Sequence, residues 1–124
     1  MNQKLLEISQ NWFDHVNRNV VNDVVELYDS RATFHPTLSG DFIQDTNAVR
    51  QYFKGFMSLK PHVTVVSFDL QELVETAFVF VGVMTIEVDE NNERIMIRAR
   101  FSFVWALEGE RWSIVHHHNS IVPS

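Results

Sequence analysis

Three consecutive histidines near the C-terminus, His116, His117 and His118, are the residues of this sequence best suited to chemistry. A neutral imidazole can act as a general base or bind a transition metal. The surrounding segment, Arg111 to Ser120, alternates apolar and polar side chains, which predicts a β-strand. Successive side chains of a strand point to opposite faces of the sheet. His117 therefore shares one face with Asn119, whereas His116 and His118 share the other.

The preceding strand, Arg94 to Leu107, should form a hairpin with the histidine strand. A three-residue loop, Leu107-Glu108-Gly109, with glycine in the left-handed conformation would place Phe101 beside Val115. A two-residue loop would turn one strand's side chains to the opposite face, and this alternative stays open. The three-residue loop predicts one apolar, aromatic face, which carries Ile97, Ala99, Phe101, Phe103, Trp105, Val115, His117 and Asn119.

A base inside an apolar cavity, with a hydrogen-bond donor aimed at a developing oxyanion, could catalyse isomerisation, dehydration or cyclisation. The candidate bases in this sequence are His117, His35 and Glu87, and the candidate donors are Tyr52 and Asn119. The alternative is that His117 is a structural histidine of the core, hydrogen-bonded to a backbone carbonyl or to water.

The pair His116 and His118 could give two ligands to zinc or iron, because both side chains point the same way. Their neighbours on that face, Arg98 and Arg100, would repel a cation. The sequence therefore predicts no metal site, and nothing in it indicates a cofactor.

The elements before the hairpin must position these side chains. Apolar residues at helical spacing predict helices at Gln3–Arg18, at Asn22–Tyr28, and from a cap at Asp45 or Thr46 to a stop at Pro61. From His62 onward the apolar period changes to two. Strands are predicted at Ala32–Pro36, Val63–Glu72, Phe78–Val88, Arg94–Leu107 and Arg111–Ser120. Helices followed by antiparallel strands indicate an α+β fold, with residues 1–124 as a single domain.

Composition argues against several classes of function. The formal net charge is −6, and nucleic-acid affinity depends on neutralising phosphates with Lys and Arg. The sequence has no cysteine, so disulfide and thiolate chemistry are excluded. No apolar run approaches the roughly 20 residues of a membrane span, and the N-terminal segment does not resemble a signal peptide. We therefore expect a cytoplasmic protein that binds neither nucleic acid nor membrane.

Short motifs across nearly the whole chain resemble the association domain of calcium/calmodulin-dependent protein kinase II. They are Asn22-Asp23-x4-Tyr28, Phe34-His35-Pro36, Arg50-Gln51-Tyr52-Phe53, Pro61-His62-Val63-Thr64, Trp112, His116-x-His118-x-Ser120 and Pro123. The resemblance extends to the nuclear transport factor 2-like superfamily, with its stand-alone prokaryotic and polyketide-cyclase-like proteins. It implies a cystatin-like cone: a strongly curved mixed, mostly antiparallel sheet wrapped around three N-terminal helices, with a pocket at the wide end.

The association domain of the kinase lines its pocket with arginines and a histidine, which this chain replaces. The aligned residues are Val49, Val83, Phe103 and Asn119. An unpaired carboxylate buried there would be costly. We therefore expect a small-ligand-binding protein with an aromatic conical pocket for a neutral, largely apolar molecule. The predicted lining is Tyr52, Phe53, Phe56, Val83, Phe101, Phe103, Trp105 and Asn119, with Phe34 and His35 at the rim.

Two alternative functions stay open. One is an isomerase, dehydratase or cyclase with His117 or His35 as its base, although the Asp and Tyr set of ketosteroid isomerases is not evident. The other is an oligomerisation module with a vestigial pocket, plugged by Phe56, Phe101, Phe103 and Trp105. A kinase is excluded, because the sequence has none of the kinase motifs.

We expect a homodimer whichever of these functions is correct. The two copies would associate through the convex face of the sheet, where Val104, Trp112 and Ile114 would otherwise be exposed.

Overall fold

The computed structural model describes residues 2–37 and 39–124. Its helices are α1 (Gln3–Arg18), α2 (Val21–Val25) and α3 (Thr46–Ser58). Its strands are β1 (Tyr28–His35), β2 (His62–Val74), β3 (Ala77–Glu90), β4 (Glu93–Glu108) and β5 (Arg111–Ile121). They form one sheet in the order β1-β5-β4-β3-β2, in which only β1 and β5 are parallel neighbours. The predicted α+β fold with a mixed, mostly antiparallel sheet is confirmed.

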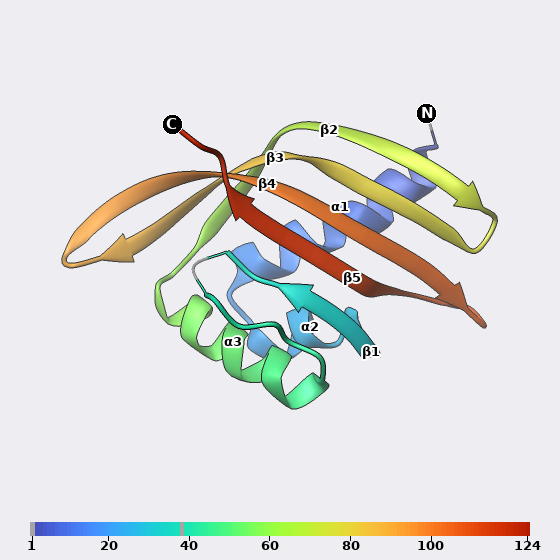
Figure 1. The fold of residues 1–124 in the computed structure, drawn as a ribbon, viewed down its shortest axis with the longest axis horizontal. Coiled ribbons are helices and arrows are strands. Elements are labelled where there is room, and N and C mark those ends of the chain that lie inside the picture. Colours follow the sequence, from blue (N-terminus) through green and yellow to red (C-terminus); the bar gives the residue numbers. More distant parts are fainter. Residues whose placement is uncertain (1, 38) are drawn as a thin grey trace.

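The helices lie on one side of the sheet, and the long strands β2 to β5 arch over them (Figure 1). The hairpin that joins β3 and β4 extends beyond the helices (Figure 1). We call the sheet face against the helices the inner face, and the opposite one the outer face. Each helix within residues 2–37 and 39–124 is too short or too polar to span a lipid bilayer.

Side-chain caps fix where the two longer helices begin. The Asn2 side chain accepts a hydrogen bond from the backbone N–H of Leu5 at 3.2 Å at the start of α1. At the start of α3, the carboxylate of Asp45 accepts one from Ala48 at 2.8 Å. Such caps satisfy N–H groups that have no partner within the helix. Both helices then turn their apolar stripes toward the sheet, and the buried members are Leu5, Trp12, Phe13, Val16, Val49, Phe53, Phe56 and Met57.

The second helix is shorter than predicted, and the first strand begins at Tyr28 rather than at Ala32. The cause is a pairing between segments far apart in the sequence. Tyr28 pairs with Ile114 of β5, and the Ile114 backbone N–H donates to the carbonyl oxygen of Leu27 at 2.7 Å. A parallel partner for β1 outweighs the local helical pattern.

The β4–β5 hairpin differs from the predicted register in two ways, whose effects on side-chain direction cancel while the residue pairs themselves stay shifted. Its turn contains two residues, so that Glu108 pairs with Arg111. The ladder then shifts between Trp105, which pairs with Ile114, and Val104, which pairs with His116. The skipped residue, Val115, forms a β-bulge, which moves the following side chains to the other face.

The bulge decides which predictions about β5 hold. His117 and Asn119 lie on the inner face as predicted, and both are buried. Phe101 pairs with Asn119 instead of the predicted Val115. Ile114 was predicted to be exposed on the outer face, but it is fully buried because it lies on the turn side of the bulge.

Gly82 of β3 occupies a position where β2 approaches closely. A Cβ at Gly82 would lie 2.0 Å from the carbonyl oxygen of Ser67 and 2.8 Å from the Cα of Phe68. Because these atoms belong to the backbone, β2 would have to move. We predict that Gly82→Ala lowers the free energy of unfolding by about 1–3 kcal/mol, as measured by urea denaturation.

Gly55 of α3 supplies the matched control for this prediction. A Cβ at Gly55 would meet no atom within 4 Å, and alanine is favoured over glycine inside a helix. Gly55→Ala should therefore raise the free energy of unfolding by about 0.5–1 kcal/mol. A Gly82→Ala protein as stable as the wild type would show that β2 is not held against Gly82.

Candidate functional site

The imidazole of His117 lies at the centre of the inner face, sandwiched between two phenyl rings. Phe34 stacks on one side with ring centroids 4.4 Å apart, and Phe103 stacks on the other at 3.9 Å. The sheet register produces this arrangement, because His117 pairs with Phe34 of β1 and with Phe103 of β4. The indole of Trp12, from α1, meets the imidazole edge-on at 5.3 Å.

A chain of hydrogen bonds runs through the same place. Trp12 donates from Nε1 to the hydroxyl oxygen of Tyr28 at 3.0 Å. Tyr28 Oη lies 2.7 Å from His117 Nδ1, and His117 Nε2 lies 2.7 Å from Asn119 Oδ1. An amide oxygen only accepts, so Nε2 of the neutral imidazole carries the proton. Nδ1 therefore accepts from the Tyr28 hydroxyl, and every ring nitrogen of His117 is satisfied.

Burial keeps this polar chain uncharged. It lowers the pKa of His117 well below the ordinary value of 6.5, although the hydrogen bond to Asn119 acts in the opposite direction. It also raises the pKa of the Tyr28 hydroxyl well above 10.0. His117 is 0% exposed, and its only lone pair in the ring plane already accepts from Tyr28. It therefore behaves as the structural core histidine that the sequence allowed as an alternative.

The depressed pKa of His117 predicts a loss of stability in acid. Below pH 6.5 the unfolded chain binds a proton at this histidine and the folded chain does not, so protonation favours unfolding. The contribution of His117 is thus complete above that pH and declines as the pH falls. His117 adds to the pH dependence of the free energy of unfolding a slope that approaches about 1.4 kcal/mol per pH unit. His117→Gln, which cannot titrate, should show a shallower decline in urea denaturation between pH 7 and pH 5, and an unchanged slope would contradict this assignment.

The predicted pocket residues come together on the inner face, but they pack against one another. Phe53 is 0% exposed, Phe101 2%, and Phe103 and Trp105 1% each. Such burial leaves no water-sized space against these rings. Part of the filling comes from α1, where Phe13 meets Phe101 edge-on at 5.5 Å. The predicted lining is therefore a filled aromatic core at these positions, because the helix supplies rings that occupy the interior.

Three predicted site residues lie on the outer face, away from His117. Val83 pairs with Arg100 and alternates with the buried Met84, so it cannot line the interior. His35 pairs with His118 and is exposed, with its ring stacked on Phe42 at a centroid distance of 4.6 Å. Glu87 also faces outward. His35 is predicted at the rim of the pocket that His117 lines, but it faces away from His117, because His35 and its inward-facing neighbour Phe34 point to opposite faces of the sheet.

Tyr52 and Phe56 of α3 lie at the margin of the aromatic core. The hydroxyl of Tyr52 donates to the backbone carbonyl of Thr37 at 3.1 Å. It therefore does not reach His117. Sequence reasoning missed Trp12 and Tyr28 as polar partners of His117, because Trp12 belonged to an apolar stripe and Tyr28 to a predicted helix.

The outer face holds a small group of histidines around His118. The ring of His35 lies 5.1 Å from that of His118 and 6.0 Å from that of His116. His116 is also paired, since its Nδ1 lies 2.7 Å from the hydroxyl of Thr33. Burial and the two neighbouring histidines lower the pKa of His116. Within residues 2–37 and 39–124, no group of three or more His, Asp or Glu side chains is arranged to hold a metal ion.

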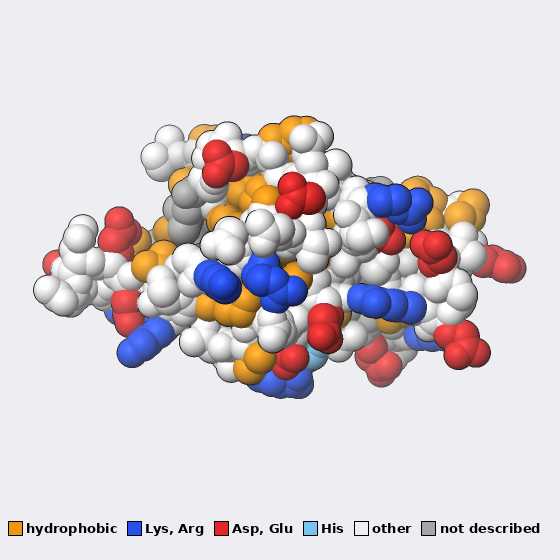
Figure 2. Space-filling model, turned by 90° about the horizontal axis from the view of Figure 1, so that it is seen from below, with side chains coloured by type: hydrophobic (Ala, Val, Ile, Leu, Met, Phe, Trp, Pro, Cys, Tyr) orange, Lys and Arg blue, Asp and Glu red, His pale blue; other side chains and the backbone are white. Residues whose placement is uncertain are grey.

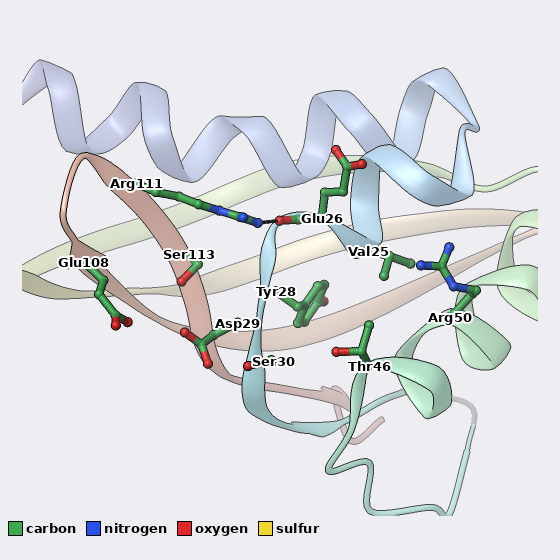
Figure 3. Close-up of a pocket in the computed structure, with 10 residues that line it drawn as sticks. All are labelled: Val25, Glu26, Tyr28, Asp29, Ser30, Thr46, Arg50, Glu108, Arg111 and Ser113. Carbon is green, nitrogen blue, oxygen red and sulfur yellow. Dashed lines mark hydrogen bonds between the residues drawn. The ribbon is translucent and has the colours of Figure 1, made fainter.

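A surface hollow of about 410 Å³ lies beside Tyr28, between α2, α3 and the start of β5 (Figure 3). Its lining differs from the predicted apolar pocket, because charged and hydroxyl side chains dominate it. They include Glu26, Asp29, Ser30, Thr46, Arg50, Glu108, Arg111 and Ser113.

Several of these charged groups already have partners. Arg31 contacts Asp29 at 3.1 Å and Glu108 at 3.2 Å. Arg111 donates to the backbone carbonyl of Glu26, and Arg50 donates to Asn22. Acidic and basic side chains are likewise mixed on the side of the molecule seen in Figure 2.

The comparisons with known proteins agree with this fold. A calcium/calmodulin-dependent protein kinase type II from Caenorhabditis briggsae is 27% identical over 124 residues, which cover 98% of this chain and 23% of that protein. The chain spans less than a quarter of the length of the curated kinases that it matches.

Two solved structures illustrate the range of similar folds. A calcium/calmodulin dependent protein kinase II association domain from Xanthomonas campestris has a TM-score of 0.92 at 24% identity, covering 98% of this chain and 88% of that one. An epoxide hydrolase/cyclase-like enzyme of pyran ring formation in salinomycin has a TM-score of 0.73 at 19% identity, covering 97% and 92%. Other similar structures are described as cystatin-like or NTF2-like. The family model for the calcium/calmodulin dependent protein kinase II association domain matches residues 1–123, and the chain belongs to that family.

Proposed function

We propose that this chain is a self-association module, in which two copies pack through the outer faces of their sheets. The observation that carries the proposal is the contrast between the two faces. The inner face is filled by its own aromatic rings, whereas the outer face carries half-buried valines that no element of the described chain covers. These valines are Val79, Val81, Val83 and Val104.

The composition of the outer face suits a protein interface. Val79 pairs with Val104 across β3 and β4, and Val81 pairs with Ser102. Exposed charges surround this centre, among them Arg98 and Arg100. An apolar centre with a polar rim is the usual anatomy of an interface between subunits. The family to which the chain belongs is itself named for association.

This interface differs in its centre from the one that the sequence predicts. Ile114 is 0% exposed and cannot contribute. The ring of Trp112 packs edge-on against Phe78 at 5.2 Å and is half-buried. Of the three apolar residues expected at the interface, only Val104 belongs to the proposed one. The valines of β3 take the place of Trp112 and Ile114.

A small-molecule function receives less support from this geometry. A neutral ligand, or a substrate for isomerase, dehydratase or cyclase chemistry, would have to displace one of the rings stacked on His117. A base also needs a free lone pair within reach of the proton it takes. The Nδ1 lone pair of His117 accepts from Tyr28 and is sealed from solvent, so catalysis by this residue is not favoured.

The proposal predicts that Val81→Glu dissociates the assembly. A carboxylate at the centre of the interface would be buried without a partner, so we expect the dissociation constant to rise by roughly 100-fold. Sedimentation velocity at micromolar concentration measures this change.

The matched control is Val20→Glu, at a residue that is 44% exposed and lies before α2, away from the sheet. It should associate like the wild type. If the wild type associates and Val81→Glu does so equally well, the outer face is not the interface. Circular dichroism confirms that both variants are folded.

A further inference from the structure

Charges on the outer face are distributed unevenly across the sheet. One row of paired residues crosses it from Asp69 on β2, through Val81 and Ser102, to His118 on β5. On the β2 and β3 half of the outer face, the acidic groups are Asp69 of β2 and Glu87 of β3, and Glu87 pairs with one imidazole, His62 of β2. The opposite side carries basic groups and imidazoles, namely Arg98, Arg100, His116, His118 and His35.

Two copies that meet face to face can be related by a two-fold axis that runs along the strands or across them. An axis across the strands lays β2 over β2 of the partner and β5 over β5, which opposes like charges. An axis along the strands lays β2 of each copy over β5 of the other, which opposes acidic and basic sides. Like charges placed opposite each other are costly, so complementarity favours the second arrangement.

The position of the apolar centre fits an axis along the strands. The valines of the outer face lie on β3 and β4, so the axis would pass between these two strands. Strands β2 and β5 then lie at equal distances on either side, each about 4.8 Å beyond its neighbour. Because Asp69 and His118 belong to the same row, the axis brings each of them over the other residue in the second copy.

We propose that two copies pack with β2 of each over β5 of the other, so that Asp69 faces His118 of the partner subunit. This inference rests on the self-association proposed above. Asp69 would meet an imidazole that is flanked by His35, His116 and Arg100 in its own chain. Within one chain Asp69 and His118 lie at opposite ends of their row, and the dimer would bring the carboxylate of Asp69 against the cluster of the second copy.

A charge-exchange experiment tests this arrangement. Asp69→Lys places a cation over the histidine cluster, and His118→Glu places a carboxylate over Asp69. Each variant alone should self-associate about tenfold more weakly than the wild type. In an equimolar mixture, the cation of the Asp69→Lys chain faces the carboxylate of the His118→Glu chain, and the second contact keeps the native pair of Asp69 and His118. Native mass spectrometry, which separates the two chains by mass, should therefore show mainly the heterodimer.

The outcomes separate this inference from the function on which it rests. Both side chains are exposed, so the variants should keep the wild-type circular dichroism spectrum. A dimeric wild type whose variants mix without preference for the heterodimer would overturn the β2-over-β5 arrangement alone. A monomeric wild type would overturn self-association itself.

Discussion

Replacing His117 with alanine should lower the free energy of unfolding by about 3–5 kcal/mol in urea denaturation. The substitution opens a cavity between the rings of Phe34 and Phe103, which now stack on the imidazole at 4.4 Å and 3.9 Å. It also leaves the Tyr28 hydroxyl and the Asn119 amide oxygen buried without their present partner. The lost packing and the lost hydrogen bonds act in the same direction.

The same variant should respond to free imidazole. Its cavity would keep two aromatic walls, a hydroxyl donor and an amide acceptor, so imidazole can bind to the folded state and raise the melting temperature. The wild type, whose site is filled, should not respond. Lys54→Ala is the control, because its side chain is exposed on α3, away from the outer face of the sheet, and we expect a change within about 0.5 kcal/mol. Wild-type stability of His117→Ala would refute the central packing role of His117.

Removing the Tyr28 hydroxyl should destabilise the protein by about 2–4 kcal/mol, although the ring remains. That oxygen accepts from Trp12 Nε1 at 3.0 Å and donates to His117 Nδ1 across 2.7 Å. Tyr28→Phe therefore leaves both a donor, Trp12 Nε1, and an acceptor, His117 Nδ1, buried without a partner. Urea denaturation measures the loss.

Tyr52→Phe is the control for this change. Its hydroxyl makes one hydrogen bond, to the Thr37 carbonyl, and the side chain is half-buried. We expect a loss of about 1 kcal/mol. Equal losses for the two tyrosines would mean that the Trp12–Tyr28–His117 chain has no special importance for stability.

The placement of His117 on the inner face could be predicted from alternation in β5, but only because two deviations cancel. The turn lies at Gly109 and Glu110 instead of Leu107-Glu108-Gly109, which reverses the predicted faces of β5, and the bulge at Val115 reverses them again. Gly109 has a φ of 65°, which a glycine favours in either kind of turn. The turn sequence alone therefore could not decide between the two registers. Ile114 lies between the turn and the bulge, where only the first deviation acts, so its predicted place on the outer face is wrong.

The hydrogen-bond partners of His117 could not be predicted from local sequence. Tyr28 reaches His117 because β1 pairs in parallel with β5, and the two strands are separated by most of the chain. Parallel pairing over such a distance leaves no local pattern. Trp12 has the helical spacing of any core residue, so its hydrogen bond to Tyr28 could not be predicted either.

The sequence also could not show whether the aromatic residues of the inner face line a cavity or fill a core. Phe101 and Phe103 were correctly placed on the inner face, and either function needs them there. The difference depends on how deeply α1 places Trp12 and Phe13 between them. That depth is a property of the packed structure, since Trp12 approaches Phe103 at 5.2 Å and Phe13 approaches Phe101 at 5.5 Å.

Sedimentation equilibrium of the wild-type chain at micromolar concentration tests self-association most directly. A sealed inner face and a valine-centred outer face predict an assembly of at least twice the chain mass of 14.5 kDa, and dilution should shift it toward the single chain by mass action. A species of 14.5 kDa across the whole concentration range would contradict the proposed function.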